Sequence, residues 1–92
     1  MYMSLFKVLT KIKDEKEFEI FIRDLCTPNE IRAMQERWLV AQALHEGKLS
    51  YREIEEKVGS SLATITRVAR FLKDEPHKGY KTVLDRISKK KG

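Results

Sequence analysis

Short hydroxylated side chains followed by arginines fill residues 60–70 of this 92-residue chain. Hydroxyl groups bind phosphate oxygens and base edges, alanine and threonine methyls contact the thymine methyl, and arginine binds guanine or phosphate. A helix enters the DNA major groove only if its first side chains are small enough for close approach. The pattern therefore predicts contact with duplex DNA. The candidate contact residues are Ser60, Ser61, Ala63, Thr64, Thr66, Arg67 and Arg70, with Arg52 a few positions earlier.

Two short helical patterns position these residues. Ser50 and Glu53 form a capping box that starts the first helix, and Gly59 stands where a tight turn needs a positive φ. Either of the two serines that follow can cap the second helix. The spacing predicts a helix-turn-helix over about residues 50–73. Its inward side chains are expected to be Ile54, Val58, Ile65, Val68 and either Phe71 or Leu72.

The remaining elements also have helical periodicity. Residues 14–26 place apolar side chains on one stripe, and a second capping box at Thr27 and Glu30 opens a helix that should end at Gly47. A break over residues 73–79 precedes a last helix, whose stripe is Tyr80, Val83, Leu84 and Ile87. The chain is therefore predicted to be all-α, with about six helices and one domain over residues 1–92.

The long helix over residues 28–46 has two apolar stripes. One contains Ile31, Met34, Trp38 and Ala41, and the other contains Ala33, Val40 and Leu44. A helix that is apolar on two sides is usually packed on two sides, and a chain this small encloses little core by itself. A homodimer is therefore expected. A two-fold dimer would also present two recognition helices to DNA half-sites about 34–36 Å apart.

Positive charge is concentrated in the second half of the chain. Residues 1–46 contain seven basic and eight acidic residues, whereas residues 47–92 contain twelve basic and six acidic residues, including the Lys89–Lys91 tail. The net charge of +5 thus arises entirely in the half with the helix-turn-helix pattern. Phosphate contacts supply most non-specific affinity for nucleic acid, so this distribution favours a polyanionic partner.

Other classes of chemistry find little support in the sequence. His45 and His77 lack carboxylate or cysteine neighbours at metal-ligand spacing, and Cys26 ends an apolar stripe, so neither a metal site nor a catalytic residue is predicted. The longest strongly apolar run, Trp38–Ala41, is far too short to span a membrane. A single cysteine and an N-terminus without a secretory pattern favour the cytoplasm. We expect a protein that is not an enzyme.

Three short strings resemble the tryptophan-repressor superfamily, and the shortened N-terminus resembles its YerC/YecD branch. The strings are CTPNE at 26–30, EGKLSYRE at 46–53 and LATITR at 62–67. The resemblance implies an intertwined all-helical homodimer that binds operator DNA and represses transcription, with amino-acid biosynthesis genes as candidate targets. It also implies DNA contacts by Arg52 and, on the recognition helix, by Leu62, Ala63, Thr64 and Thr66.

An effector site is implied by the same resemblance. The family's corepressor lies between two arginines, matched here by Arg37 and Arg67, and near a threonine matched by Thr27. The family's glycine and serine beside the ligand are replaced by Val68 and Phe71, which add bulk to a close-packed site. L-tryptophan is therefore disfavoured as corepressor. Two alternatives remain open: a different amino-acid-like ligand, or a site filled by the protein's own side chains.

Competing explanations exist for the helix-turn-helix residues themselves. The hydroxyls are also ordinary helix caps, and any single arginine is also an ordinary surface charge. A helical module that binds protein partners is the main alternative to a DNA-binding regulator. RNA binding is less favoured, because no aromatic stacking face is interleaved with the basic residues.

Overall fold

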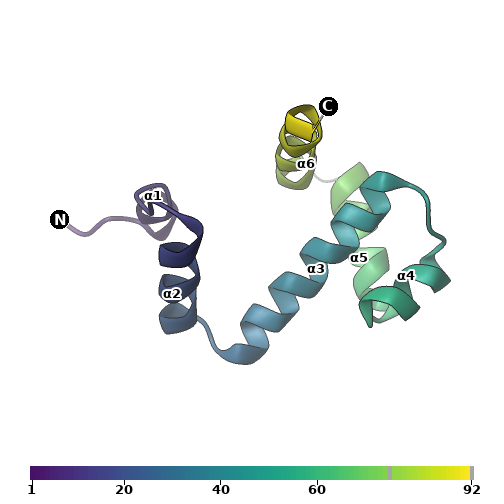
Figure 1. Ribbon diagram of the computed structural model, residues 1–92, viewed down its shortest axis with the longest axis horizontal. Coiled ribbons are helices and arrows are strands. Elements are labelled where there is room, and N and C mark those ends of the chain that lie inside the picture. The colour runs from purple at the N-terminus through teal and green to yellow at the C-terminus, as the bar shows by residue number, and fades with distance from the viewer. Residues whose placement is uncertain (75, 92) are drawn as a thin grey trace. The chain divides into compact units, whose positions relative to one another are not determined.

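The computed structural model describes the backbone of residues 1–74 and 76–91, and the side chains among them up to residue 88. Six α-helices and no strand occur in this described part (Figure 1). They are α1 (Leu5–Leu9), α2 (Glu15–Leu25), α3 (Pro28–Glu46), α4 (Tyr51–Val58), α5 (Leu62–Lys73) and α6 (Gly79–Lys91). The predicted all-α class and helix-turn-helix are confirmed.

The chain divides into two compact units, Met1–Arg32 and Ala33–Gly92. In the first unit, α2 follows the prediction, with the Asp14 side chain accepting a hydrogen bond from Glu17 N at 2.8 Å. Helix α1 was not predicted, since its five residues are too few to show a period. Its N-cap is Ser4, which accepts from Lys7 N at 3.2 Å. Neither α1 nor α2 contains a buried residue.

Helix α3 begins with the predicted capping box. Thr27 N donates to Glu30 Oε1 at 2.8 Å, and Glu30 N donates to Thr27 Oγ1 at 3.1 Å. These two bonds satisfy backbone and side-chain groups that a helix start otherwise leaves open. They also stabilise the carboxylate and so lower the pKa of Glu30. The helix ends before Gly47, whose φ of 74° is the left-handed conformation typical of a residue just after a helix.

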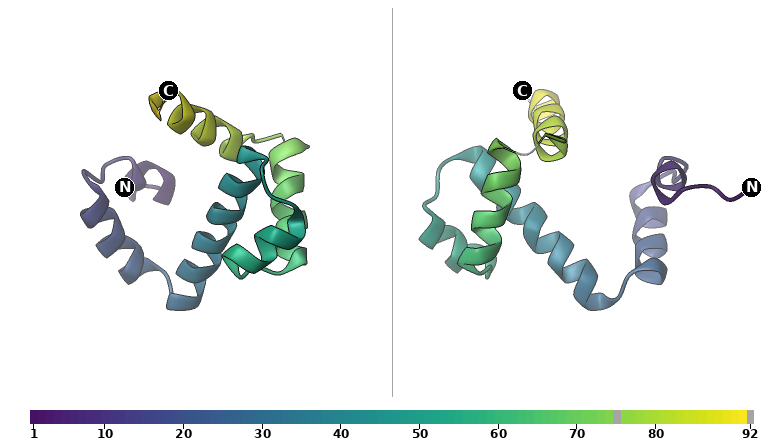
Figure 2. Two further views of the ribbon diagram at one scale, coloured as in Figure 1. Left: turned by 45° about the vertical axis from the view of Figure 1, so that its right-hand side comes forward. Right: turned by 180° about the vertical axis from the view of Figure 1, so that it is seen from behind.

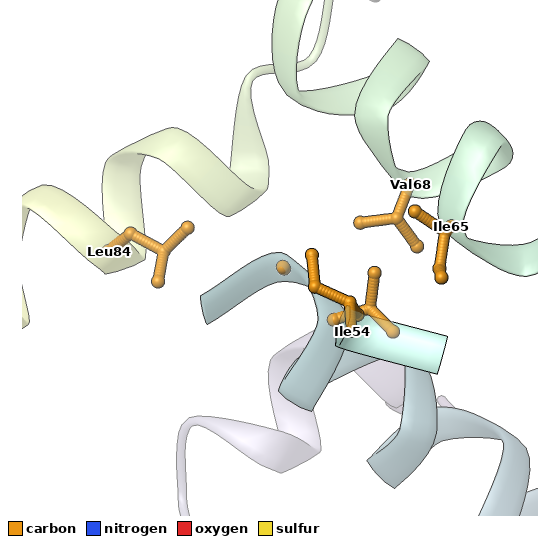
Figure 3. Packing of buried hydrophobic residues seen from close by; sticks show 6 residues of the cluster. Ile54, Ile65, Val68 and Leu84 are labelled. Atoms are coloured by element: carbon orange, nitrogen blue, oxygen red, sulfur yellow. The ribbon is translucent and has the colours of Figure 1, made fainter. Parts of the chain in front are cut away.

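The hydrophobic core lies in the second unit. Figure 3 shows the buried side chains of α4, α5 and α6 directed toward one another, and Figure 2 shows α4 and α5 beside α3. The largest fully buried side chains are Val40, Ile54, Ile65 and Val68, each at most 1% exposed. Burial of each stabilises the fold by about 1.5–3 kcal/mol. The inward positions predicted for the helix-turn-helix are thus confirmed, and Leu72 rather than Phe71 packs against the core.

Several predicted apolar stripes are only partly covered. On α6, Leu84 is buried and Tyr80 packs against the core, but Val83 is 42% exposed and Ile87 is 38% exposed. On α3, Val40 and Ala41 are buried, whereas Met34 remains 42% exposed. Each stripe therefore has one side in the core and one side at the surface. The side chains of the Lys89–Lys91 tail lie outside the described residues, and the single domain over residues 1–92 stays a prediction.

Candidate nucleic-acid interface

The turn between α4 and α5 is built from Gly59, Ser60 and Ser61. Gly59 has φ 77° and its N–H donates to Glu55 O at 2.9 Å, which closes α4. Ser61 is the N-cap of α5, since its Oγ accepts a hydrogen bond from Thr64 N at 3.2 Å. Of the two serines predicted as caps, Ser61 is the one that caps. The turn thereby sets the direction in which α5 leaves α4.

The two helices are fixed to one another through their inward residues. Ile54 of α4 and Ile65 of α5 are both fully buried in the same cluster, together with Val40 of α3. The capping box at the start of α4 is complete, with Glu53 N donating to Ser50 Oγ at 3.2 Å and Ser50 N donating to Glu53 Oε1 at 2.9 Å. These bonds lower the pKa of Glu53. The helix pair is therefore a rigid support for whatever side chains face outward.

The outward face of α5 collects most of the predicted DNA-contact residues. Its side chains are uncharged near the helix start and basic further along, and they line a hollow of about 610 Å³. The lining residues are Leu62, Ala63, Thr66, Arg67 and Arg70. Helix α5 contains three basic and no acidic residues. This surface combines close approach with positive charge, as a major-groove contact requires.

The serine and threonine hydroxyls of this segment differ in their exposure and in the hydrogen bonds they already make. Ser61 Oγ also donates to Thr64 Oγ1 at 3.1 Å, so both hydroxyls already take part in the cap. Thr66 is exposed on the hollow. Ser60 is only 6% exposed and its hydroxyl lies 3.4 Å from Ser61 O. The structure therefore does not place the Ser60 side chain on the outward face, although the sequence suggested it as a DNA contact.

Arg52 lies on α4 and is strongly exposed. Its side chain is 89% exposed, and Nε lies 4.0 Å from Glu56 Oε1 one turn away. An exposed ion pair of this kind contributes only about 0.3–0.5 kcal/mol to stability. It therefore does not prevent the guanidinium from binding another anion. The exposed guanidinium of Arg52 is thus available to bind an anion.

The three residues suggested for an effector are divided between the two units of the chain. Thr27 belongs to the first unit and its hydroxyl accepts the cap bond of α3, whereas Arg37 and Arg67 belong to the second unit. The hollow on α5 includes Arg67 but not Arg37. Val68, which replaces a family glycine, is 1% exposed and belongs to the core.

Phe71, predicted as an inward residue or as bulk in the effector site, lies beside two arginines of α5. Arg67 Cζ lies 4.5 Å from the centroid of the Phe71 ring, and Arg70 Cζ lies 5.6 Å from it. The i, i+4 spacing of Arg67 and Phe71 was a visible signal for such a contact. The ring also lines a separate apolar groove of about 580 Å³, with Trp38, Tyr80, Val83 and residues 77–79.

Other chemistry is not indicated by the described residues. No group of three or more His, Cys, Asp or Glu side chains is arranged there to hold a metal ion. None of the helices in residues 1–74 and 76–91 is both long and apolar enough to cross a lipid bilayer.

Comparison with known proteins decides the family. The sequence model of the Trp repressor protein family matches residues 2–88, nearly the whole chain. The chain belongs to the Trp repressor family. YerC of Bacillus subtilis (strain 168) is 42% identical over 84 residues, which cover 91% of this chain and 79% of YerC. A Trp operon repressor homolog of Chlamydia caviae is 36% identical over 86 residues, covering 94% of this chain and 84% of that protein.

Solved structures agree with this placement. A TrpR-like protein from Eubacterium eligens superposes with a TM-score of 0.84 at 40% identity, over 91% of this chain and 84% of that one. The chain is thus a YerC-type member of the Trp repressor family, whose members are transcriptional regulators and not enzymes. Its α4 and α5 occupy the place that the sequence resemblance assigned to the helix-turn-helix.

Proposed function

We propose that this protein is a homodimeric, sequence-specific DNA-binding regulator that represses transcription from a palindromic operator. The observation that carries the proposal is the outward face of α5. There, small side chains and two arginines share one hollow on a helix without acidic residues. Backbone N–H groups at the start of the helix also favour phosphate. Amino-acid biosynthesis genes are the targets that the family resemblance suggests.

The proposed DNA contacts are the exposed residues of the helix-turn-helix. Leu62, Ala63 and Thr66 would meet base edges in the major groove, and Arg52, Arg67 and Arg70 would bind guanine or phosphate. Ser61 and Thr64 would mainly set the start of α5, because their hydroxyls bond to one another. Ser60 is left out of the proposed contact set because it is buried.

The homodimer is supported by the apolar side chains that one chain leaves exposed. In the first unit, Phe6 is 82% exposed, Ile20 is 55% exposed and Leu25 is 50% exposed. In the second unit, Val83 of α6 lines the apolar groove, and Ile87 of the same helix is also exposed. A large contiguous apolar patch on the surface of a soluble protein usually marks an interaction site. A second copy of the chain would cover these side chains and would place two α5 helices on one palindromic site.

Selection from random duplexes followed by binding measurements tests the function. The selected duplex should carry two inverted half-sites and should bind at least tenfold more tightly than an unrelated duplex. Binding to both should weaken steeply between 50 and 200 mM salt, because each phosphate contact contributes a slope of about 0.9 in the double-logarithmic plot. Absence of duplex binding even at low salt would refute the proposal and favour the protein-interaction module. Preference for single-stranded or structured RNA would instead favour the RNA-binding alternative.

A further inference from the structure

Arg67 is held by an aromatic ring and not by a carboxylate. Its guanidinium lies 4.5 Å from the Phe71 ring centroid, well within the distance of about 6 Å for a cation–π contact. No salt bridge to Arg67 occurs among the described residues, and α5 contains no acidic residue. Among the described residues, the guanidinium of Arg67 is therefore contacted by the uncharged ring of Phe71.

The kind of support matters for binding a polyanion. A carboxylate partner would order the arginine but would also neutralise it and compete with phosphate. An aromatic face orders the side chain while leaving its five N–H donors and its full charge for another anion. An arginine side chain has high rotamer entropy, so restricting it before binding lowers the entropic cost of holding it on DNA.

The Phe71 ring also borders an apolar groove. It is half-buried, and with Trp38 and Tyr80 it lines the apolar groove. Its backbone belongs to α5, whose neighbouring residues Val68 and Leu72 pack in or against the core. The ring therefore links the buried side of α5 with the outward hollow that Arg67 lines.

We propose that Phe71 is a positioning residue, whose ring holds Arg67 on the outward face of α5 in readiness for DNA. This inference rests on the proposed function, because Arg67 needs a polyanionic partner. Phe71 itself makes no contact with DNA in this scheme. The chain's own Phe71 ring orders the arginine side chain, and no bound small molecule is required.

The test is a double-mutant cycle between the two residues, measured as duplex affinity of the dimer at several salt concentrations. Phe71→Met keeps a large apolar side chain but removes the aromatic face, and Phe71→Tyr retains the face. We expect Phe71→Met to weaken duplex binding about two- to fivefold for each half-site, the size of one exposed cation–π contact. Phe71→Tyr should bind as wild type does. In the Arg67→Gln background, Phe71→Met should cause no further loss.

Melting curves and the wild-type measurement make each outcome decisive. If Phe71→Met does not fold, Phe71→Leu takes its place in the cycle. Wild-type affinity in the ring-deleted variant would overturn this inference and leave the proposed function standing. A loss that persists in the Arg67→Gln background would also overturn it, because the ring would then act through packing or through Arg70, whose Cζ lies 5.6 Å from its centroid. Failure of the wild-type protein to bind any duplex would overturn both proposals.

Discussion

The side chain of Arg52 is exposed and makes only a weak ion pair within the protein. Its side chain is 89% exposed, and its one recorded partner, Glu56, lies at 4.0 Å. We expect Arg52→Ala to reduce affinity for the selected duplex about 5- to 150-fold, the range for loss of a base-contacting arginine. The melting temperature should change by little, because an exposed pair contributes little to stability.

Arg23→Ala is the matched control for this measurement. Arg23 lies on α2, outside the helix-turn-helix, and pairs with Glu19 one turn away at 2.8 Å. Its replacement removes the same charge from an exposed side chain on another helix. Fluorescence anisotropy with both variants separates a local contact from a general loss of positive charge. Equal losses in the two variants would contradict the assignment of Arg52.

The turn between the helices depends on a backbone conformation that only glycine adopts easily. Gly59 has φ 77°, and an added Cβ would meet nothing within 4 Å. The cost of Gly59→Ala is therefore conformational and not steric, and we expect about 1–2 kcal/mol of lost stability. Gly59→Asn should cost less, because asparagine tolerates the left-handed region. Urea unfolding measures both, and equal stability of Gly59→Ala and wild type would contradict this account.

The capping box of α4 predicts a pH dependence of stability. Hydrogen bonds from the Ser50 backbone and side chain lower the pKa of Glu53 from its usual 4.5 in the folded state. The carboxylate therefore stabilises the fold above that value, and its contribution is lost as the pH falls through the lowered folded-state pKa. The difference in unfolding free energy between wild type and Glu53→Gln should shrink below pH 4.5.

Glu56→Gln serves as the control for the capping measurement. Glu56 is a carboxylate on the same helix, but its recorded contact is with the exposed Arg52 side chain and not with a helix terminus. Denaturant unfolding between pH 7 and pH 3 is compared for the three proteins. A Glu56→Gln difference that shrinks as much as the Glu53→Gln difference would show that the capping bond is not the cause.

At the scale of the whole molecule, exposed apolar surface predicts self-association. Val83 is 42% exposed and lines the apolar groove, so Val83→Asp would place a charge in the proposed dimer interface. We expect this variant to sediment as a monomer and to lose the concentration dependence of its melting temperature. Thr82→Asp adds the same charge at the neighbouring exposed position and should remain dimeric. A dimeric Val83→Asp would contradict the role of this groove.

L-tryptophan should not stabilise the protein. Val68 fills core volume with 1% of its surface exposed, and the Phe71 ring lies beside Arg67. A ligand at 100 times its Kd raises the free energy of unfolding by about 2.7 kcal/mol, which a melting curve detects readily. We expect no change in melting temperature on titration with L-tryptophan. A saturable increase would show that a site for it exists despite these side chains.

Local features of this protein follow from its sequence alone. The capping residues Ser50 and Thr27, the glycines at 47 and 59, and the inward stripe of α4 and α5 are all where their spacing predicts. Such features depend on neighbours within one or two helical turns, so the sequence contains the information directly. The basic face of α5 belongs to the same class, because residues three and four positions apart share a helix face.

Tertiary packing decided what periodicity left open. An apolar stripe shows that a side chain prefers burial but not which surface covers it, so only the fold selects Leu72 over Phe71 for the core and leaves Val83 exposed. The same packing buries Ser60. Helix, cap and turn thus come from local chemistry. Which side chains remain available for DNA or for a second chain depends on contacts between residues distant in the sequence.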